Sequence, residues 1–480
     1  FARYPTLSVG YVAAILRNAG IDVSVVSPLA RGVGSYKRIT RPHMFGQLEA
    51  ILRHYTAVTG LDPVRKLRDR VAQAYSPARS SVQEPTVEAV RDVLARDVDL
   101  VMISAYTMYK DVCADICAEA QANNVAVIVG GPMFTVPEVT QSWLSIPGLT
   151  GVYVGEPEAD LADIIAAALR GPDAPCAGLV RPGDAPTCAR APLSELDTIP
   201  FPDYSDFPWD RYPNTIIPMM TGRGCGWGVC TFCSDVLTAA GRTYRSRSPE
   251  NVLGEMRFQS DRHKAKIFTF LDLKLNSNLA VWHALIDQAQ ATVPGCEWTA
   301  SVHVNINGEN GLDREALKDA RKAGLSRITT GLESGSQKIL NSMARGTNTE
   351  MLSQFVRYAS EAGISVRMTS IIGYPGETSD DVKATTSFLK THYDYIDRIV
   401  VNRLAVSPMT PLGLMLDKNP ARYPQIRVSG LDLDTGLLDH DNATFRTDGH
   451  LAASTGLLRA AHRINRKPLH GASLTFEGVL

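Results

Sequence analysis

Three cysteines stand close together in the middle of this 480-residue chain, and their side chains could bind a metal centre. Cys225, Cys230 and Cys233 lie in the glycine-rich stretch TGRGCGWGVCTFC. Thiolates are soft ligands that favour zinc or iron–sulfur clusters. A structural zinc site closes with four protein ligands, whereas three cysteines on a [4Fe–4S] cluster leave one iron open to another ligand. The pattern favours the cluster; zinc completed by His263 or His303, or three merely packed thiols, are the alternatives.

The other five cysteines show no comparable grouping. They are Cys113, Cys117, Cys176, Cys188 and Cys296. The first two are spaced one helical turn apart, together with apolar neighbours, which is typical of core packing. Eight cysteines in 480 residues are also too sparse for a disulfide scaffold.

The composition excludes several classes of protein. Lys and Arg total 49 against 50 Asp and Glu, so the net charge of −1 argues against a chain-wide surface for nucleic acid or anionic membranes. The long apolar runs, such as 161–169, fall far short of the ~20 residues that a membrane span needs. Because no signal peptide is evident either, we expect a cytoplasmic protein that contacts no membrane.

The segment before the cysteines alternates helices with short apolar strands. Strands are predicted at 21–26, 98–104, 125–129 and 151–154, and helices at 8–18, 87–96, 110–122, 138–144 and 160–170. Residues 28–86 interrupt this alternation with two amphipathic helices, at 44–55 and 64–75. The pattern predicts an α/β fold with a doubly wound, Rossmann-like domain over 1–171. Ligands of such domains lie beyond the carboxyl ends of the strands, where small-residue turns follow each strand here.

The remainder of the chain divides into a linker, a second α/β unit and an extension. Residues 172–215 are rich in proline and predict a linker. Strands are predicted at 216–221, 266–272, 297–302, 326–333, 364–372 and 396–405. Six strand–helix repeats predict a partial (β/α)6 barrel over 216–410, with a small C-terminal extension over 411–480. The cysteines follow the first barrel strand and so lie at the carboxyl end, where barrel active sites lie.

The cysteine pattern resembles that of the radical S-adenosylmethionine (SAM) superfamily. The usual pattern of that family is Cys-x3-Cys-x2-Cys with an aromatic residue before the last cysteine, and Phe232 matches the aromatic. The first gap is four residues here, a departure also found within the superfamily. The resemblance implies that Cys225, Cys230 and Cys233 ligate a [4Fe–4S] cluster, whose fourth iron binds the amino and carboxylate groups of SAM.

Three further segments of the barrel resemble elements of the same family. FTFLD at 268–272 resembles the second strand and ends in Asp272, whose carboxylate is expected to contact SAM. GLESGS at 331–336 resembles the fourth strand and its turn, where Glu333 and Ser334 are expected to help to hold SAM. SIIGYPGET at 370–378 resembles the fifth strand, where Ile371 and Gly373 are expected to support the adenine. The usual Gly-Gly-Glu element is not evident, so no residue is assigned to the methionyl amine.

A doubly wound domain ahead of such a barrel resembles the cobalamin-dependent (class B) branch of the family. The cobalamin motif Asp-x-His-x-x-Gly, aligned on Gly10, puts its Asp at Pro5 and its His at Leu7, so neither position supplies a metal ligand. The same alignment places the first strand of the domain before Phe1. The cobalamin contacts implied by the resemblance are Leu7, Ser104, Ala105, Tyr106, Gly130, Gly131, Gly155 and Glu156. A nucleotide-type or purely structural α/β domain is the alternative.

The resemblance implies a methyltransferase-like enzyme that methylates an unactivated carbon of a small-molecule or peptide substrate. One SAM would methylate reduced cobalamin, and a second would yield a 5′-deoxyadenosyl radical that abstracts hydrogen from the substrate. An electron donor such as flavodoxin or ferredoxin would serve the cluster. Polar residues near strand ends that could contact substrate are His303, Asn305 and Arg403. The alternatives are a cobalamin-dependent cyclase or rearrangement enzyme, and a radical SAM enzyme without cobalamin, such as a methylthiotransferase.

Overall fold

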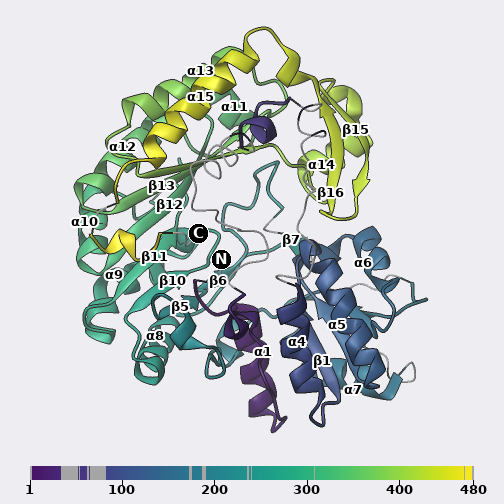
Figure 1. The fold of residues 1–480 in the computed structure, drawn as a ribbon. Helices are drawn as coiled ribbons and strands as arrows, with labels where there is room; N and C mark the ends of the chain where they lie inside the picture. Colours follow the sequence, from purple (N-terminus) through teal and green to yellow (C-terminus); the bar gives the residue numbers. More distant parts are fainter. Residues whose placement is uncertain are drawn as a thin grey trace.

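The computed structural model describes residues 3–33, 52, 54–61, 64, 67, 83–171, 174, 176–185, 191–234, 237–238, 241–306, 309–469 and 471–477. Figure 1 shows a curved parallel sheet backed by helices, with a smaller α/β domain beside it and a C-terminal segment that reaches both. The predicted α/β class and the order of the two α/β units are confirmed.

The N-terminal domain is built on a four-stranded sheet in the order β1-β2-β3-β4. Its strands are β1 (Leu100–Ser104), β2 (Ala126–Gly130), β3 (Gly151–Tyr153) and β4 (Leu179–Val180), of which only β4 is antiparallel. Its helices are α1 (Leu7–Asn18), α4 (Gln83–Leu94), α5 (Lys110–Ala122), α6 (Pro137–Leu144) and α7 (Leu161–Arg170). Apolar side chains are buried on both faces of the sheet, valines such as Val127 and Val129 on one and Ile128 and Tyr153 on the other, as expected for parallel strands covered by helices.

Two sequence predictions for this domain have different outcomes. The strand predicted at 21–26 is wrong: these residues form no strand, because no described segment supplies a hydrogen-bonding partner. The helices predicted at 44–55 and 64–75 fall almost entirely outside the described residues.

The second sheet has six parallel strands in the order β14-β13-β12-β11-β10-β5. They are β5 (Ile216–Met219), β10 (Ile267–Phe270), β11 (Glu297–Ser301), β12 (Leu325–Glu333), β13 (Ser365–Ile372) and β14 (Arg398–Arg403). The helices outside them are α8 (Pro249–His263), α9 (Leu279–Thr292), α10 (Arg314–Lys322), α11 (Gln337–Ser342), α12 (Thr349–Glu361) and α13 (Ser379–Thr391). Among the described residues β5 and β14 do not pair, so the predicted partial barrel is open.

The C-terminal extension contacts every part of the molecule. Its elements are α14 (Pro411–Lys418), the hairpin of β15 (Ile426–Asp432) and β16 (Leu437–Asn442), α15 (His450–Asn465) and η11 (Gly471–Leu474). The side chain of Asn465 on α15 bonds both backbone groups of Ile399 on β14, each at 2.8 Å. Beyond α15, the carbonyls of Ser473 and Phe476 accept hydrogen bonds from buried Arg327 of β12.

A short segment of the N-terminal region lies far from the rest of that region and packs on the barrel. His54 Nε2 lies 3.0 Å from the carbonyl oxygen of Val401 on the edge strand β14, and the hydroxyl of Tyr55 lies 3.0 Å from Thr455 Oγ1 on α15. Gly60 packs so closely on Phe445 that a Cβ there would lie 2.3 Å from its ring. Residues 54–61 therefore cover the edge of the barrel that β14 leaves open.

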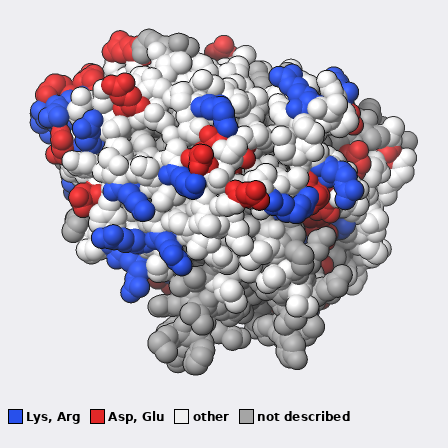
Figure 2. Space-filling model, turned by 90° about the horizontal axis from the view of Figure 1, so that it is seen from above, with Lys and Arg blue, Asp and Glu red and all other residues white. Residues whose placement is uncertain are grey.

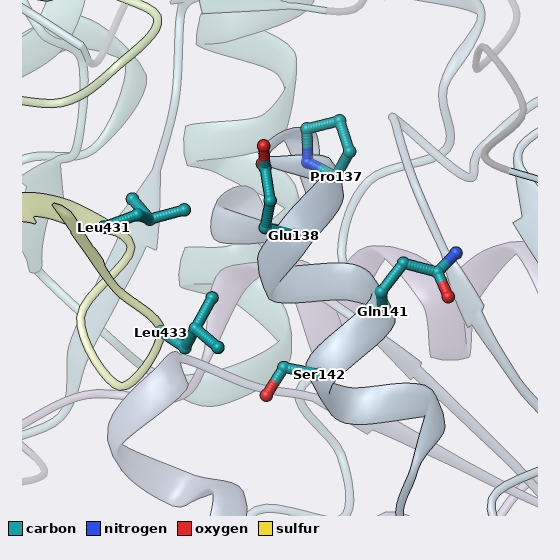
Figure 3. A pocket seen from close by; sticks show the side chains of 6 residues that line it. All are labelled: Pro137, Glu138, Gln141, Ser142, Leu431 and Leu433. Atoms are coloured by element: carbon teal, nitrogen blue, oxygen red, sulfur yellow. The ribbon is translucent and has the colours of Figure 1, made fainter.

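The hairpin reaches back to the N-terminal domain. In Figure 3, Leu431 and Leu433 point from the hairpin toward α6, where Glu138 and Ser142 line the other side of a groove of about 530 Å³. None of the predicted site residues lines this groove. It therefore marks a contact between domains.

The surface carries no single-sign patch on the face seen in Figure 2, where basic and acidic side chains are intermixed. No helix among the described residues is long and apolar enough to cross a membrane.

Candidate functional site

The cysteine loop, residues 221–234, begins at the carboxyl end of β5, as predicted. Its first residues form β6 (Gly222–Arg223), which pairs with β9 (Arg245–Ser246). Gly224 follows with φ of 87°, and a Cβ there would lie 2.0 Å from the carbonyl oxygen of Thr243. Only glycine fits this backbone position. The chain therefore turns sharply just before Cys225.

Asp272 fixes the start of this loop. Its carboxylate accepts hydrogen bonds from the backbone N–H of Thr221 and of Gly222, at 3.0 and 2.8 Å, and from the Thr221 hydroxyl at 2.7 Å. Burial raises the pKa of Asp272 to about 6, against the effect of these donors. Predicted as a SAM contact, Asp272 is found bonded to the loop backbone, so its direct role in the structure is to position the cysteines.

The three cysteines are partly buried and form no disulfide in the described chain. Burial raises the pKa of the Cys230 thiol, and the charges of Arg345 and Lys274 oppose that shift. The far end of the loop is tied down by the Thr231 N–H, which donates to the Met343 carbonyl at 3.0 Å. The loop is thus held at both ends, with cationic groups near its thiols.

The two histidines considered as a fourth zinc ligand have different surroundings. His303 Nδ1 is in contact with Arg345 Nη1, and the His263 ring stacks near Trp209 with centroids 5.0 Å apart. Among the residues that the structure describes, no group of three or more histidine, cysteine or acidic side chains is arranged to hold a single metal ion.

A buried polar group surrounds the loop from three neighbouring strand ends. Lys274 follows β10, His303 follows β11, and Glu333 ends β12. Asn276 joins the first two segments, since its side chain bonds the N–H and the carbonyl of His303 at 2.8 and 3.0 Å. Glu333 Oε1 lies 3.9 Å from Arg345 Nε, and Glu333 has a strained φ of 55°.

Hydrogen-bond donors outnumber acceptors in this group. Because the Arg345 guanidinium can only donate, His303 Nδ1 must accept, which leaves Nε2 to carry the proton; that atom is buried without a partner. Lys274 Nζ forms no hydrogen bond or ion pair with any described residue. A buried donor without a partner, such as His303 Nε2, is costly without a ligand.

The charge states follow from the surroundings. Burial, with the charges of Arg345 and Lys274, lowers the pKa of His303 to about 2, so its ring is neutral. Burial and Arg345 lower the pKa of Lys274 to about 8, so its amine is mostly charged at neutral pH. Three soft thiols beside two cations fit an anionic iron–sulfur cluster with an anionic ligand on its open iron.

Trp227, inside the cysteine loop, connects the loop to this polar group. Its ring lies over His303 with centroids 5.5 Å apart, and its Nε1 donates to the Ala344 carbonyl at 2.8 Å. A Cβ at Gly346 would lie 2.1 Å from the Trp227 ring, so the indole is closely confined.

The other predicted SAM contacts in the barrel are mostly engaged within the protein. Ser334 is fully buried, and its Oγ accepts from the Ser336 N–H at 3.2 Å. Gly373, with φ of 84°, donates its N–H to Glu377 at 2.6 Å and accepts from Asn442 at 2.7 Å. Phe232 and Ile371 pack on one apolar cluster, which brings the cysteine loop and the fifth strand of the barrel together.

The predicted cobalamin contacts lie along one edge of the N-terminal sheet. Ser104 Oγ lies 3.0 Å from Ser8 Oγ at the start of α1, and Tyr106 is 55% exposed. The other turns pack closely: a Cβ at Gly131 would lie 2.0 Å from the carbonyl oxygen of Ala105, whose N–H donates to the Gly130 carbonyl at 2.8 Å. Leu7 instead packs into the same apolar cluster as the barrel core.

Glu156 contacts the barrel directly. It follows Gly155 at the end of β3, and its carboxylate bonds Arg223 at 2.5 Å and Arg245 at 2.6 and 2.9 Å. Glu158 pairs with the same Arg223. The sequence analysis missed both arginines, although Arg223 stands two residues before Cys225.

Large apolar side chains are exposed after strand ends of both sheets. They are Tyr106 and Met108 after β1, Val229 after β5, Ile306 after β11 and Met409 after β14. Because exposed apolar groups at the ligand-binding edge favour binding of an apolar surface, this edge suits a large, partly apolar ligand.

Comparison with known proteins shows that the barrel is similar to a known family. Residues 219–389 match the radical SAM superfamily. An uncharacterized methyltransferase of Pyrococcus horikoshii is 31% identical over 61% of this chain and 64% of its own length. A methylthiotransferase by name, from Methanocaldococcus jannaschii, is 26% identical over 57% of this chain and 60% of its own length. The chain therefore spans less than two thirds of either relative.

Two solved structures share the arrangement of domains. One is OxsB, a cobalamin-dependent SAM radical enzyme with aqua-cobalamin and SAM bound. The match covers 78% of this chain and 59% of the OxsB chain, with a TM-score of 0.62 and a sequence identity of 17%. The other is the radical SAM methyltransferase TsrM of Kitasatospora setae, with tryptophan and a SAM analogue bound. The match covers 72% of this chain and 70% of the TsrM chain, with a TM-score of 0.56 and a sequence identity of 18%. Residues 219–389 of the chain are therefore similar to the radical SAM superfamily, and the fold of the chain is similar to those of OxsB and TsrM.

Proposed function

We propose that this protein is a cobalamin-dependent radical SAM C-methyltransferase that acts on an unactivated carbon of a small-molecule or peptide substrate. One observation carries the proposal: the cysteine loop lies between the carboxyl ends of two parallel sheets and is bonded to both. Asp272 holds it from the barrel, and Glu156 holds Arg223 from the N-terminal domain. Ligands of such sheets lie at these ends, so two cofactors could meet there.

Cys225, Cys230 and Cys233 would hold the [4Fe–4S] cluster that a radical SAM domain implies. When bound, the cluster and SAM supply a hydrogen-abstracting radical, and cobalamin supplies a methyl group. The chain's own part would be to position the cofactors and the substrate and to exclude water from the site. Lys274 and Arg345 offset the negative charge of thiolates and of a SAM carboxylate, and Trp227 closes the site against His303.

The N-terminal sheet edge would receive cobalamin. The fold is shared with OxsB, whose structure contains aqua-cobalamin, and the edge exposes Tyr106 and Met108. Leu7 stands where the cobalamin motif has a histidine and would offer no ligand to cobalt; its side chain is buried in the core cluster shared with the barrel. We propose a cytoplasmic enzyme that draws electrons from a donor such as flavodoxin or ferredoxin.

Anaerobic reconstitution tests the proposal without knowledge of the substrate. Protein loaded with iron, sulfide and cobalamin should bind about four irons per chain and show a corrinoid spectrum. With SAM and reductant it should release S-adenosylhomocysteine only when cobalamin is present, and 5′-deoxyadenosine only when the cluster is intact. Protein that binds no corrinoid, or that carries zinc without iron and sulfide, would contradict the proposal.

A methylthiotransferase is the second candidate, because a relative at 26% identity carries that name. Product mass separates the two reactions: methyl transfer adds about 14 Da, and methylthio transfer adds about 46 Da. A rearranged or cyclised product would show neither gain.

Lys274 gives a prediction of its own. Lys274→Met should weaken the binding of SAM to cluster-loaded protein about 10- to 100-fold, because a charged donor to a carboxylate is lost. In the unaltered protein the affinity should also fall as the pH rises through about 8, where Lys274 loses its charge, and the variant should lack this step. Equilibrium binding measures both effects. Lys322→Met on exposed α10 is the control, and equal affinities in all three proteins would exclude this role.

A further inference from the structure

The two domains are joined beside the cysteine loop by a network of four charged side chains: Glu156, Glu158, Arg223 and Arg245. Glu156 bridges the two arginines, and Glu158 holds the second guanidinium nitrogen of Arg223. The side chains are only 8–22% exposed. Burial alone would raise the pKa of Glu156, but the bonds from Arg245 and the charge of Arg223 lower it below its ordinary value. Arg245 holds both oxygens of Glu156, and Arg223 gives one bond each to Glu156 and Glu158. Such partly buried charged hydrogen bonds are stronger than ordinary surface pairs.

The arginines need these carboxylates. Arg223 and Arg245 are directly opposite each other in the β6–β9 ladder. Like charges opposite each other destabilise a strand pair, and in the described structure the one carboxylate that pairs with both arginines is that of Glu156 in the N-terminal domain. Without Glu156, the two guanidiniums would repel at the base of the loop.

The network also lies at the ligand edge of the N-terminal sheet. Glu156 directly follows Gly155, whose φ of 129° forms the turn after β3. Arg223 lies two residues before Cys225 and one before the confined Gly224. The same carboxylate therefore belongs to the turn at one sheet edge and sets the start of the cysteine loop at the other.

We propose that Glu156 is a positioning residue, which orders the cysteine loop and sets the spacing between the cluster and cobalamin. The second half of this inference rests on the proposed function. Glu156 would act through Arg223 and Arg245 and would not touch a reacting atom.

Glu156→Gln keeps the shape of the side chain and removes its charge, and anaerobic, cluster-loaded protein tests it in two ways. Amide hydrogen exchange at residues 222–226 should become about 10- to 100-fold faster, as expected for the loss of charged hydrogen bonds. With added cob(II)alamin and a reduced cluster, pulsed electron paramagnetic resonance should give a single narrow distance between the two centres in the unaltered protein. The variant should give a broadened distribution.

Glu119→Gln is the matched control. Glu119 also accepts two bonds from one arginine, Arg91, but both residues lie within the N-terminal domain. Unchanged exchange and an unchanged distance distribution in Glu156→Gln, or equal changes in the control, would overturn the inference. If Glu156→Gln does not fold, Arg245→Lys, which keeps the charge but cannot hold both oxygens, must show the faster exchange. Unaltered protein without a corrinoid signal would contradict the proposed function, while the exchange result would still decide the role of Glu156 in the loop.

Discussion

On the proposed function, Cys230→Ala is expected to abolish reductive cleavage of SAM and to prevent full cluster assembly. With two thiolates left, the loop cannot complete the three-cysteine set of a [4Fe–4S] cluster with one open iron. The fold should survive, because the backbone bond from Thr231 to Met343 does not depend on the thiol. Release of 5′-deoxyadenosine, measured anaerobically with a reductant, should fall at least about 1000-fold, since cofactor chemistry has no substitute in the protein.

The chain provides a matched control for this change. Cys176 is partly buried like the three loop cysteines but lies after α7, outside the site. Cys176→Ala should leave iron content and SAM cleavage as in the unaltered protein. Cleavage retained in Cys230→Ala would mean that the cluster ligands had been assigned to the wrong cysteines.

Asp272→Asn gives the second large effect, through the loop and not through the cofactors. The carboxylate accepts from three buried donors on Thr221 and Gly222. The side-chain amide of asparagine would present its N–H₂ group to some of these donors and leave them without an acceptor. We expect this loss to destabilise the local structure by about 3–5 kcal/mol. Cluster content after reconstitution should drop several-fold, with hydrogen exchange increased at residues 221–224.

Asp160→Asn distinguishes this effect from the general cost of altering a buried aspartate. Asp160 is equally buried, but it accepts a hydrogen bond from the Tyr153 hydroxyl at 2.7 Å, which an amide oxygen can also accept. Iron and sulfide analysis of both variants provides the comparison. Full cluster content in Asp272→Asn would show that the loop orders without this anchor.

The fold was largely predictable because its signals are local. Buried apolar runs bounded by glycine and proline placed the barrel strands within a few residues: 364–372 was predicted where β13 spans Ser365–Ile372. Helix caps were nearly as clear. Ser248 caps α8, which begins with Pro249, and Asn348 caps α12 through a bond from the Met351 N–H. The strand predicted at 21–26 failed because composition alone does not supply a pairing partner.

The three cysteines could be selected from the sequence by their spacing, but the residues that support their loop could not. The contacts of Asp272 with Thr221 and Gly222 were not predictable, since a sequence does not show that these residues turn back toward its carboxylate. The pair of Glu156 and Arg223 depends on how two domains dock across 67 residues of sequence. The one signal in the sequence that could have suggested this pair is the position of Arg223, two residues before Cys225.

The cover that residues 54–61 place on the barrel edge has a consequence for folding. His54 and Val401 are 347 residues apart, and Tyr55 and Thr455 are 400 apart. Closing such loops costs conformational entropy before any contact repays it, so contacts of this range form slowly and late. On the ribosome, the β14 edge is made after residues 54–61 and before α15, so its cover is complete only when α15, whose Asn465 bonds Ile399, has also been made. During that interval, the incompletely covered edge strand exposes backbone groups that can pair with another newly made chain.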